Sequence, residues 1–221
     1  MADIGDVLDE FFSPFSSEKL WVFPETDDYT DLVRGWQAVI DASVRIKVRL
    51  AANCAHWKAN NVSNPAWTPT KSDAPKLNAD REFVPSPPGT DPDTCKKAFI
   101  IYAASIAAKT VAGGVVGGIL GPTIETRDLY LCSIGSFNIY TTVDVIDCGA
   151  KTAKMNFWMY NSMSKRSFGK FADNPVFKAC GMKTQYMWWN WVESVDWSSG
   201  SVRTLPGGVM PGGTSGGGWA G

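Results

Sequence analysis

Residues 137–160 constrain the fold of this chain most strongly, because their side chains alternate in character with a period of two. The first half is rich in β-branched and aromatic residues, and one face of its strand would carry Ile139, Thr141, Val143 and Val145. Gly149 lies in the break that follows and can adopt the positive φ of a tight reversal. Residues 153–160 then alternate again. The pattern predicts a β-hairpin with one apolar face.

Two segments before the hairpin follow helical periodicity. Residues 3–12 carry apolar side chains at i, i+3 and i+4 and acidic ones opposite, which predicts an amphipathic helix packed on the body. From Thr30 or Asp31, both suitable N-caps, a long helix is expected to reach about residue 59. Its apolar face would include Ile40, Val44 and Val48. Over residues 44–50, apolar residues alternate with basic ones, which is typical of a strand and is the competing interpretation.

The remaining segments complete an α+β prediction, with N-terminal helices packed on a mainly antiparallel C-terminal sheet in a single domain. Strands are expected at 129–134 and 186–191, and the large residues on both faces of the second predict that it is covered on both sides. Consecutive hairpins without crossover helices favour antiparallel pairing. We divide the chain into a helical part (1–60), a proline-rich connection (61–96), a core of one buried helix plus the sheet (97–200) and a glycine-rich flexible tail (201–221).

Residues 98–120 are mainly apolar with Lys109 as the single charged residue, and their length matches the roughly 20 residues that cross a bilayer. Gly113, Gly117 and Gly121 repeat every fourth residue, as in helix seams within membranes. Lys109 near the middle would cost about 2.5–3.5 kcal/mol on insertion. We therefore expect a central helix that is buried against the sheet and ends in a glycine-rich loop near Gly113, and insertion under other conditions stays open.

Charge and cysteine usage bear on the compartment. Acidic residues dominate residues 1–31, where Lys19 is the single base, and the rest of the chain is net positive. No secretory signal peptide begins the sequence, which indicates a cytoplasmic protein or export by another route. The 5 cysteines form no CxxC pair. We expect reduced, partly buried thiols, and the alternative is one buried disulfide if the protein is exported by another route.

Catalytic signatures are weak. His56 is the only histidine, so multi-histidine metal sites are excluded, and no metal or cofactor is predicted. Cys54 lies two positions from His56, and two such side chains on one helix point apart. Glu193 and Asp196 lie near tryptophans, a combination found in sites that bind or cleave sugars. These three residues, His56, Glu193 and Asp196, are the catalytic candidates of a hydrolase.

Residues 151–183 mix basic and aromatic side chains, with Asp173 as the single acid. Stacking rings combined with cations bind single-stranded nucleic acids and other anionic partners. The candidate binding residues are Trp158, Lys165, Arg166, Lys170 and Trp189. The alternative is that the rings face the core and the lysines face water.

Residues 156–164 and 181–191 resemble stretches of uncharacterised bacterial proteins, some of which end exported multidomain toxins; the resemblance assigns no site residue. Three hypotheses follow. The first is a delivered effector or toxin-like module that acts at a membrane or on an anionic polymer. The second is a non-catalytic binding or self-assembling subunit with a tryptophan-rich contact surface. The third is a hydrolase.

Overall fold

The computed structural model describes residues 4–72, 79–85, 92–111, 132–167, 173, 175–178 and 180–205. Its strands are β1 (Lys19–Phe23), β2 (Asp80–Val84), β3 (Phe137–Asp147), β4 (Thr152–Met163), β5 (Gln185–Asp196) and β6 (Arg203–Leu205). Its helices are α1 (Ile4–Phe12), α2 (Asp28–Arg34), α3 (Gln37–Ala52), α4 (Cys54–Asn60), α5 (Pro92–Val111) and α7 (Pro175–Lys178). The fold is α+β, as predicted.

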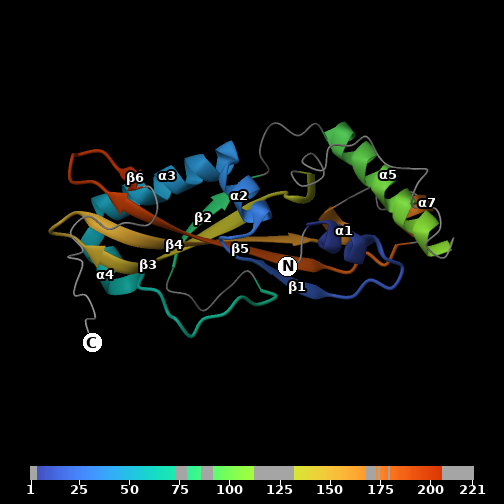
Figure 1. Ribbon diagram of the computed structural model, residues 1–221, viewed down its shortest axis with the longest axis horizontal. Coiled ribbons are helices and arrows are strands. Elements are labelled where there is room, and N and C mark those ends of the chain that lie inside the picture. The colour runs from blue at the N-terminus through green and yellow to red at the C-terminus, as the bar shows by residue number, and fades with distance from the viewer. Residues whose placement is uncertain are drawn as a thin grey trace, which may run out of the picture.

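All six strands form one mixed, mostly antiparallel sheet of order β1-β5-β4-β3-β2, with β6 beside β5. β1 runs parallel to β5, and the other pairs are antiparallel. Figure 1 shows the sheet along the long axis of the molecule, with α2 and α3 on one side and the chain after α4 on the other. The short strands β1, β2 and β6 were not predicted, because three to five residues give little periodicity.

The predicted hairpin is confirmed as β3 and β4, with two differences. The pairing register shifts between Val143 and Val145, so a bulge moves Val145 off the apolar face and leaves it 53% exposed. The turn depends on Asp147, whose Oδ1 accepts the backbone N–H groups of Gly149 and Ala150, both at 2.9 Å. The residue with a left-handed backbone is Lys151 (φ 58°), not Gly149.

The tryptophans of β5 make it the strand that both cores share. Trp189 and Trp191 are fully buried in the main cluster beneath the helices. Trp188 is fully buried on the opposite face with Tyr140 and Tyr160. The prediction that this strand is covered on both sides is therefore confirmed.

The chain after α4 covers the second face of the sheet. Trp67 lies edge-on to Trp158 and Trp188, with ring centroids 4.7 and 5.3 Å apart. The Trp188 indole donates to the Thr70 carbonyl at 2.8 Å. The first part of the proline-rich connection thus lies across the sheet, and β2 follows within the region expected to be irregular.

The expected long helix is divided into α2, α3 and α4. Gly35 ends α2, and Asn53, with φ −133° and ψ 44°, separates α3 from α4. The buried face also differs from the expected one: Val39, Ala42, Ile46 and Leu50 are buried, whereas Ile40, Val44 and Val48 are 41%, 51% and 52% exposed. α3 carries two apolar stripes, and the buried stripe is the one that cations flank.

Those cations are paired with acids of the sheet. The Arg45 Nε and Arg49 Nη1 atoms donate to the two carboxylate oxygens of Glu82 at 2.7 and 2.8 Å, and Arg49 also pairs with Asp80. Burial alone would raise the pKa of Glu82, but the hydrogen bonds from Arg45 and Arg49 outweigh it and hold this pKa below its ordinary value.

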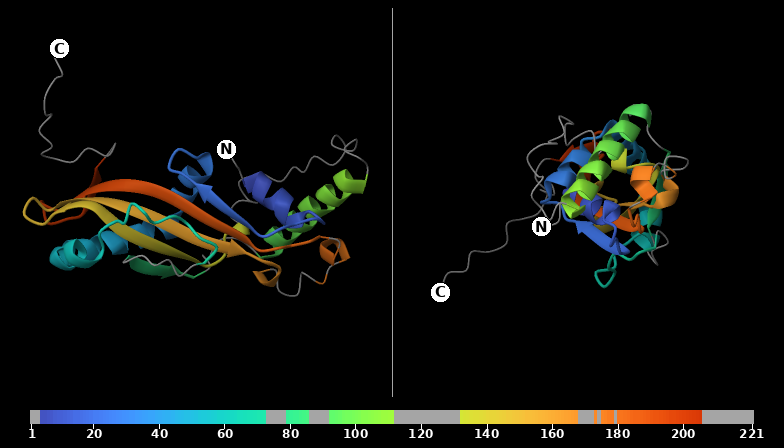
Figure 2. Two further views of the ribbon diagram at one scale, coloured as in Figure 1. Left: turned by 90° about the horizontal axis from the view of Figure 1, so that it is seen from below. Right: turned by 90° about the vertical axis from the view of Figure 1, so that its right-hand side faces the viewer.

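Helices α1, α5 and α7 pack at the end of the molecule away from α4 (Figure 2). The predicted helix at 3–12 is confirmed over Ile4–Phe12. The Phe12 ring packs on Phe99 of α5 and Phe177 of α7, with ring centroids 5.9 and 5.7 Å apart. α5 is apolar, with Ala98, Phe99 and Ala103 buried, but it packs on α1 and α7 and not centrally against the sheet as expected, and Ile101 is exposed. Gly113, Gly117 and Gly121 lie outside the described residues. Among the helices described, none combines the length and the apolar character needed to span a membrane.

The expectation of reduced thiols is wrong for four cysteines. Cys54 of α4 is bonded to Cys148 at the tip of the hairpin, and Cys95 of α5 to Cys132. Their partners are 94 and 37 residues away along the chain, so no local spacing motif marks either pair. Cys180 is free, and burial raises the pKa of its thiol.

Two further predictions fall largely outside the described residues. Of the strand expected at 129–134, only 132–134 are described, and they are not in a strand. Of the glycine-rich tail, residues 206–221 are not described.

Candidate functional site

A pocket of about 590 Å³ lies between α2 and α3 on one side and β5 and β6 on the other. Its lining residues are Asp31, Arg34, Gly35, Val39, Ile40, Ser43, Val44, Lys47, Trp191, Glu193 and Thr204. The pocket therefore combines an apolar wall with charged side chains, which is the usual character of a small-molecule site.

Lys47 and Glu193 form an ion pair in this pocket, with side chains only 9% and 11% exposed. Lys47 projects from the buried face of α3, and its Nζ also donates to Thr204 Oγ1 of β6 at 2.8 Å. The ammonium group lies 5.9 Å from the centre of the Phe157 ring. One cation thereby connects α3 to β4, β5 and β6.

The carboxylate of Glu193 is held at both oxygens. The Trp191 indole Nε1 donates to Oε1 at 2.9 Å, and Lys47 and Thr204 contact Oε2. Trp191 is itself fixed by a parallel stack on Phe157, with 5.3 Å between the ring centroids. The acid is thus locked in one orientation toward the cavity.

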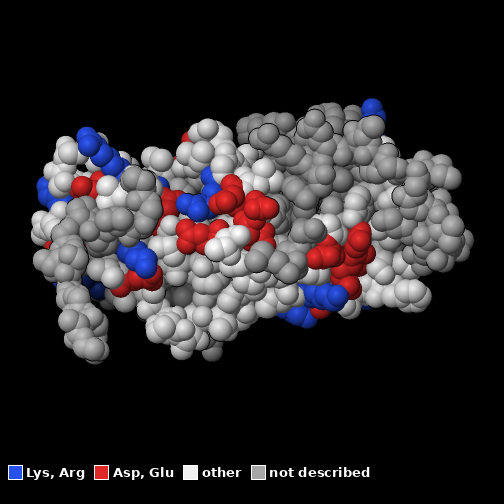
Figure 3. Space-filling view, viewed as in Figure 1, with Lys and Arg blue, Asp and Glu red and all other residues white. Residues whose placement is uncertain are grey.

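The rim of the pocket is amphipathic. Arg34, in the last turn of α2, pairs with Glu25 and Asp31 at 3.4 and 3.7 Å. Ile40 and Val44 of α3 line the cavity and are half-exposed. Figure 3 shows acidic side chains gathered around α2 with basic ones beside them, so charges of both signs surround this region.

Of the catalytic candidates, the structure places only Glu193 in the pocket. Asp196 lies three residues further along β5 and accepts the Ser198 N–H at 2.7 Å, which holds the pKa of Asp196 below its ordinary value. Residues three apart on a strand face opposite sides, so the two acids do not form a pair. His56 is exposed on α4 and contacts Asn60.

The two predicted binding tryptophans lie on opposite faces of the sheet. Lys165 and Arg166 are exposed in the turn after β4, and Lys170 lies outside the described residues. Trp158 is half-buried against Trp67 on the second face. Trp189 is fully buried and stacks on Phe23, with 5.5 Å between centroids.

No sequence pattern marked Lys47, Trp191 or Thr204 as a site residue. Lys47 was the detectable one, because it stands beside Ile46 and Leu50 on what proves to be the buried face of α3, where an unpaired lysine would be costly. Its partners lie far along the chain, 157 residues away in the case of Thr204.

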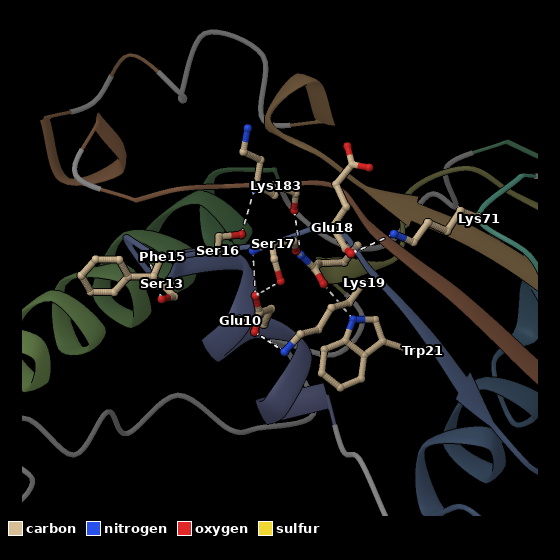
Figure 4. A network of polar contacts seen from close by, with 11 residues as sticks. Glu10, Ser13, Phe15, Ser16, Ser17, Glu18, Lys19, Trp21, Lys71 and Lys183 are labelled. Carbon is tan, nitrogen blue, oxygen red and sulfur yellow. Dashed lines mark hydrogen bonds and ion pairs between the residues drawn. The ribbon is translucent and has the colours of Figure 1, made fainter.

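A second polar network joins the connection between α1 and β1 to the segment that precedes β5 (Figure 4). Ser17 donates to Glu10, Lys183 N donates to Ser16 Oγ at 2.9 Å, and the buried Gln185 amide donates to the Ser17 carbonyl at 2.8 Å. Gly181 N also donates to the Ser13 carbonyl at 2.8 Å. These contacts hold two chain segments together, and the pocket remains the candidate site.

No group of three or more metal-binding side chains occurs within the described residues. In comparisons with known proteins, no family model, no curated protein and no solved structure matches the chain. A functional proposal therefore rests on the geometry of the pocket.

Proposed function

We propose that this chain is a non-catalytic binding module whose pocket takes a ligand that is mainly apolar and carries one charged or strongly polar group. The Lys47–Glu193 pair is the observation that carries the proposal, because two nearly buried charges line a cavity. A buried ion pair adds little stability over an apolar pair of the same volume. A cavity of about 590 Å³ with apolar walls and a few convergent polar groups has the size and character of a ligand site.

Binding fits this pocket better than catalysis. A lysine in an ion pair is charged and has no lone pair with which to accept a proton from Thr204. Both oxygens of Glu193 already accept hydrogen bonds. Ser43, the other hydroxyl that lines the cavity, has no histidine beside it among the lining residues.

The two disulfides support function in an oxidising compartment, where such bonds form and persist. In this proposal the binding module is exported, which agrees with the hypothesis of a delivered effector.

Two tryptophan substitutions on one helix face test the pocket. Val44→Trp fills the mouth of the cavity, whereas Val48→Trp places the same ring one turn away at an equally exposed position that does not line it. The probes are N-acetyl-leucine, leucinamide and N-acetyl-leucinamide. Their binding is monitored through the NMR resonance of the Trp191 indole N–H. We expect at least one of the two charged probes, N-acetyl-leucine or leucinamide, to shift this resonance in the wild type and in the Val48 variant but not in the Val44 variant. Equal shifts in both variants would refute the pocket as the site.

A second proposal is an effector that acts on an anionic membrane or polymer. The exposure of Lys165 and Arg166 supports it. We expect Lys165→Gln/Arg166→Gln to elute earlier from heparin, because fewer counterions are released on binding. The control is Lys58→Gln/Lys97→Gln, which removes the same charge from two other exposed positions. Equal elution of the two variants would contradict this second proposal.

A further inference from the structure

One edge of β5 is only partly paired. Along its other edge, β5 pairs with β4 over its whole length. On the open side, β1 pairs with Gln185–Trp189 and β6 with Ser194–Asp196. Residues 190–193 therefore have no strand beside them there among the strands described (Figure 2, left).

Proline limits the ladder on both sides of this gap. Phe23 pairs with Trp189, and the next residue in the chain is Pro24. Leu205 pairs with Ser194, and the sequence continues with Pro206. Proline has no amide hydrogen, so neither Pro24 nor Pro206 can donate to the edge of β5.

The gap and the pocket are parts of one surface. Four strand residues span about 13 Å, and alternate residues direct their N–H and C=O groups toward the open side. The side chains of Trp191 and Glu193 point from the same four residues into the pocket. A chain paired with this edge would present every second side chain to the cavity beside Val39, Ile40 and Val44.

We propose that the pocket binds an extended peptide segment, which pairs with β5 at residues 190–193 and inserts one mainly apolar side chain between α3 and Trp191. Only a peptide offers backbone donors and acceptors at the spacing of a strand edge, while the pocket supplies side-chain specificity. Lys47 and Glu193 at the floor would favour a polar group at the tip of that side chain. This inference rests on the proposed function of the pocket.

The test begins with selection of linear random nonapeptides on the full-length protein, with Val44→Trp as the counter-selection and Val48→Trp as the matched positive control. The best peptide is then methylated at one backbone nitrogen at a time. We expect affinity to fall by about tenfold or more at every second position and to change little between, because only alternate amides face β5. Enrichment of no peptide, or an effect without this alternation, would overturn strand addition.

Hydrogen exchange supplies the second readout. We expect the edge-facing amides among residues 190–193 to exchange rapidly in the free protein and at least about tenfold more slowly with bound peptide. Slow exchange in the free protein would overturn the proposal, since residues 206–221 or a second copy would then already cover the edge. Concentration dependence of that protection would identify the second copy. If leucine-derived probes still shift the Trp191 indole while strand addition fails, the pocket proposal survives alone.

Discussion

Replacing Gly181 by alanine probes how tightly the segment before β5 packs on the α1–β1 connection. A Cβ on Gly181 would lie 2.7 Å from Ser16 Cβ and 2.8 Å from the Ser13 carbonyl oxygen. Carbon atoms in contact prefer about 3.5–4.0 Å, so one segment must move by about 1 Å. The backbone φ of Gly181 is not in the left-handed region, and the cost is therefore steric.

The expected loss follows from the contacts that such a movement breaks. Gly181 N donates to the Ser13 carbonyl at 2.8 Å, and Lys183 N donates to Ser16 Oγ at 2.9 Å. Each hydrogen bond contributes about 1 kcal/mol net, and looser packing of the end of α1 adds a similar amount. We expect Gly181→Ala to lower the free energy of unfolding by about 2–3 kcal/mol, or roughly 5–10 °C in Tm.

Urea unfolding followed by tryptophan fluorescence measures this loss. Gly135→Ala is the matched control, because a Cβ there meets nothing within 4 Å. We expect the control to be neutral or stabilised by up to about 1 kcal/mol. If Gly181→Ala unfolds within about 0.5 kcal/mol of Gly135→Ala, the close packing of these two segments is refuted.

Three further predictions concern charge and disulfides. Lys47→Met and Glu193→Gln should each lower the free energy of unfolding by about 2–3 kcal/mol, near the low end for a buried pair because a cavity adjoins it. In chemical unfolding the double variant should lose less than the sum of the two single losses. Additive losses would contradict the pairing. Cys54→Ser/Cys148→Ser should lose about 2–4 kcal/mol in urea, since this bridge closes a long loop, and an unchanged midpoint would argue against the bond. Glu82 has a lowered pKa in the folded state, so its contribution is present above about pH 4.3 and is lost as the pH falls through the folded pKa. Glu82→Gln should therefore be less stable than the wild type at pH 6 in urea unfolding, and the difference should shrink as the pH falls through the folded pKa of Glu82. A difference that did not shrink in acid would refute this.

The sequence pattern predicted those strands whose faces keep the same surroundings along their whole length. The alternation in 137–160 gave the hairpin, and large residues on both faces of β5 gave its double burial. Pattern failed on α3, where two apolar stripes compete. Helical periodicity does not tell which stripe faces the sheet, and the acids that pair with Lys47 and Arg49 lie far along the chain.

The candidate site shows the same division. Glu193 was predictable, because a carboxylate beside tryptophans is a local combination. Its partner Lys47, its neighbour Thr204 and both disulfides depend on distant residues that only the fold brings together. The gap along β5 was likewise hidden, since it depends on two short strands that the sequence did not reveal.

The parallel pairing of β1 with β5 has a consequence for synthesis. Trp21 and its hydrogen-bond partner Gln185 are separated by 164 residues, which a ribosome takes roughly 10–30 s to translate. Until then β1 has no partner strand among those described, and its apolar residues stay accessible to chaperones and proteases. A nascent chain that stops before β5 would leave the N-terminal strand without a place in the sheet. Because of this strand order, the N-terminal region can finish folding only after β5 has been synthesised.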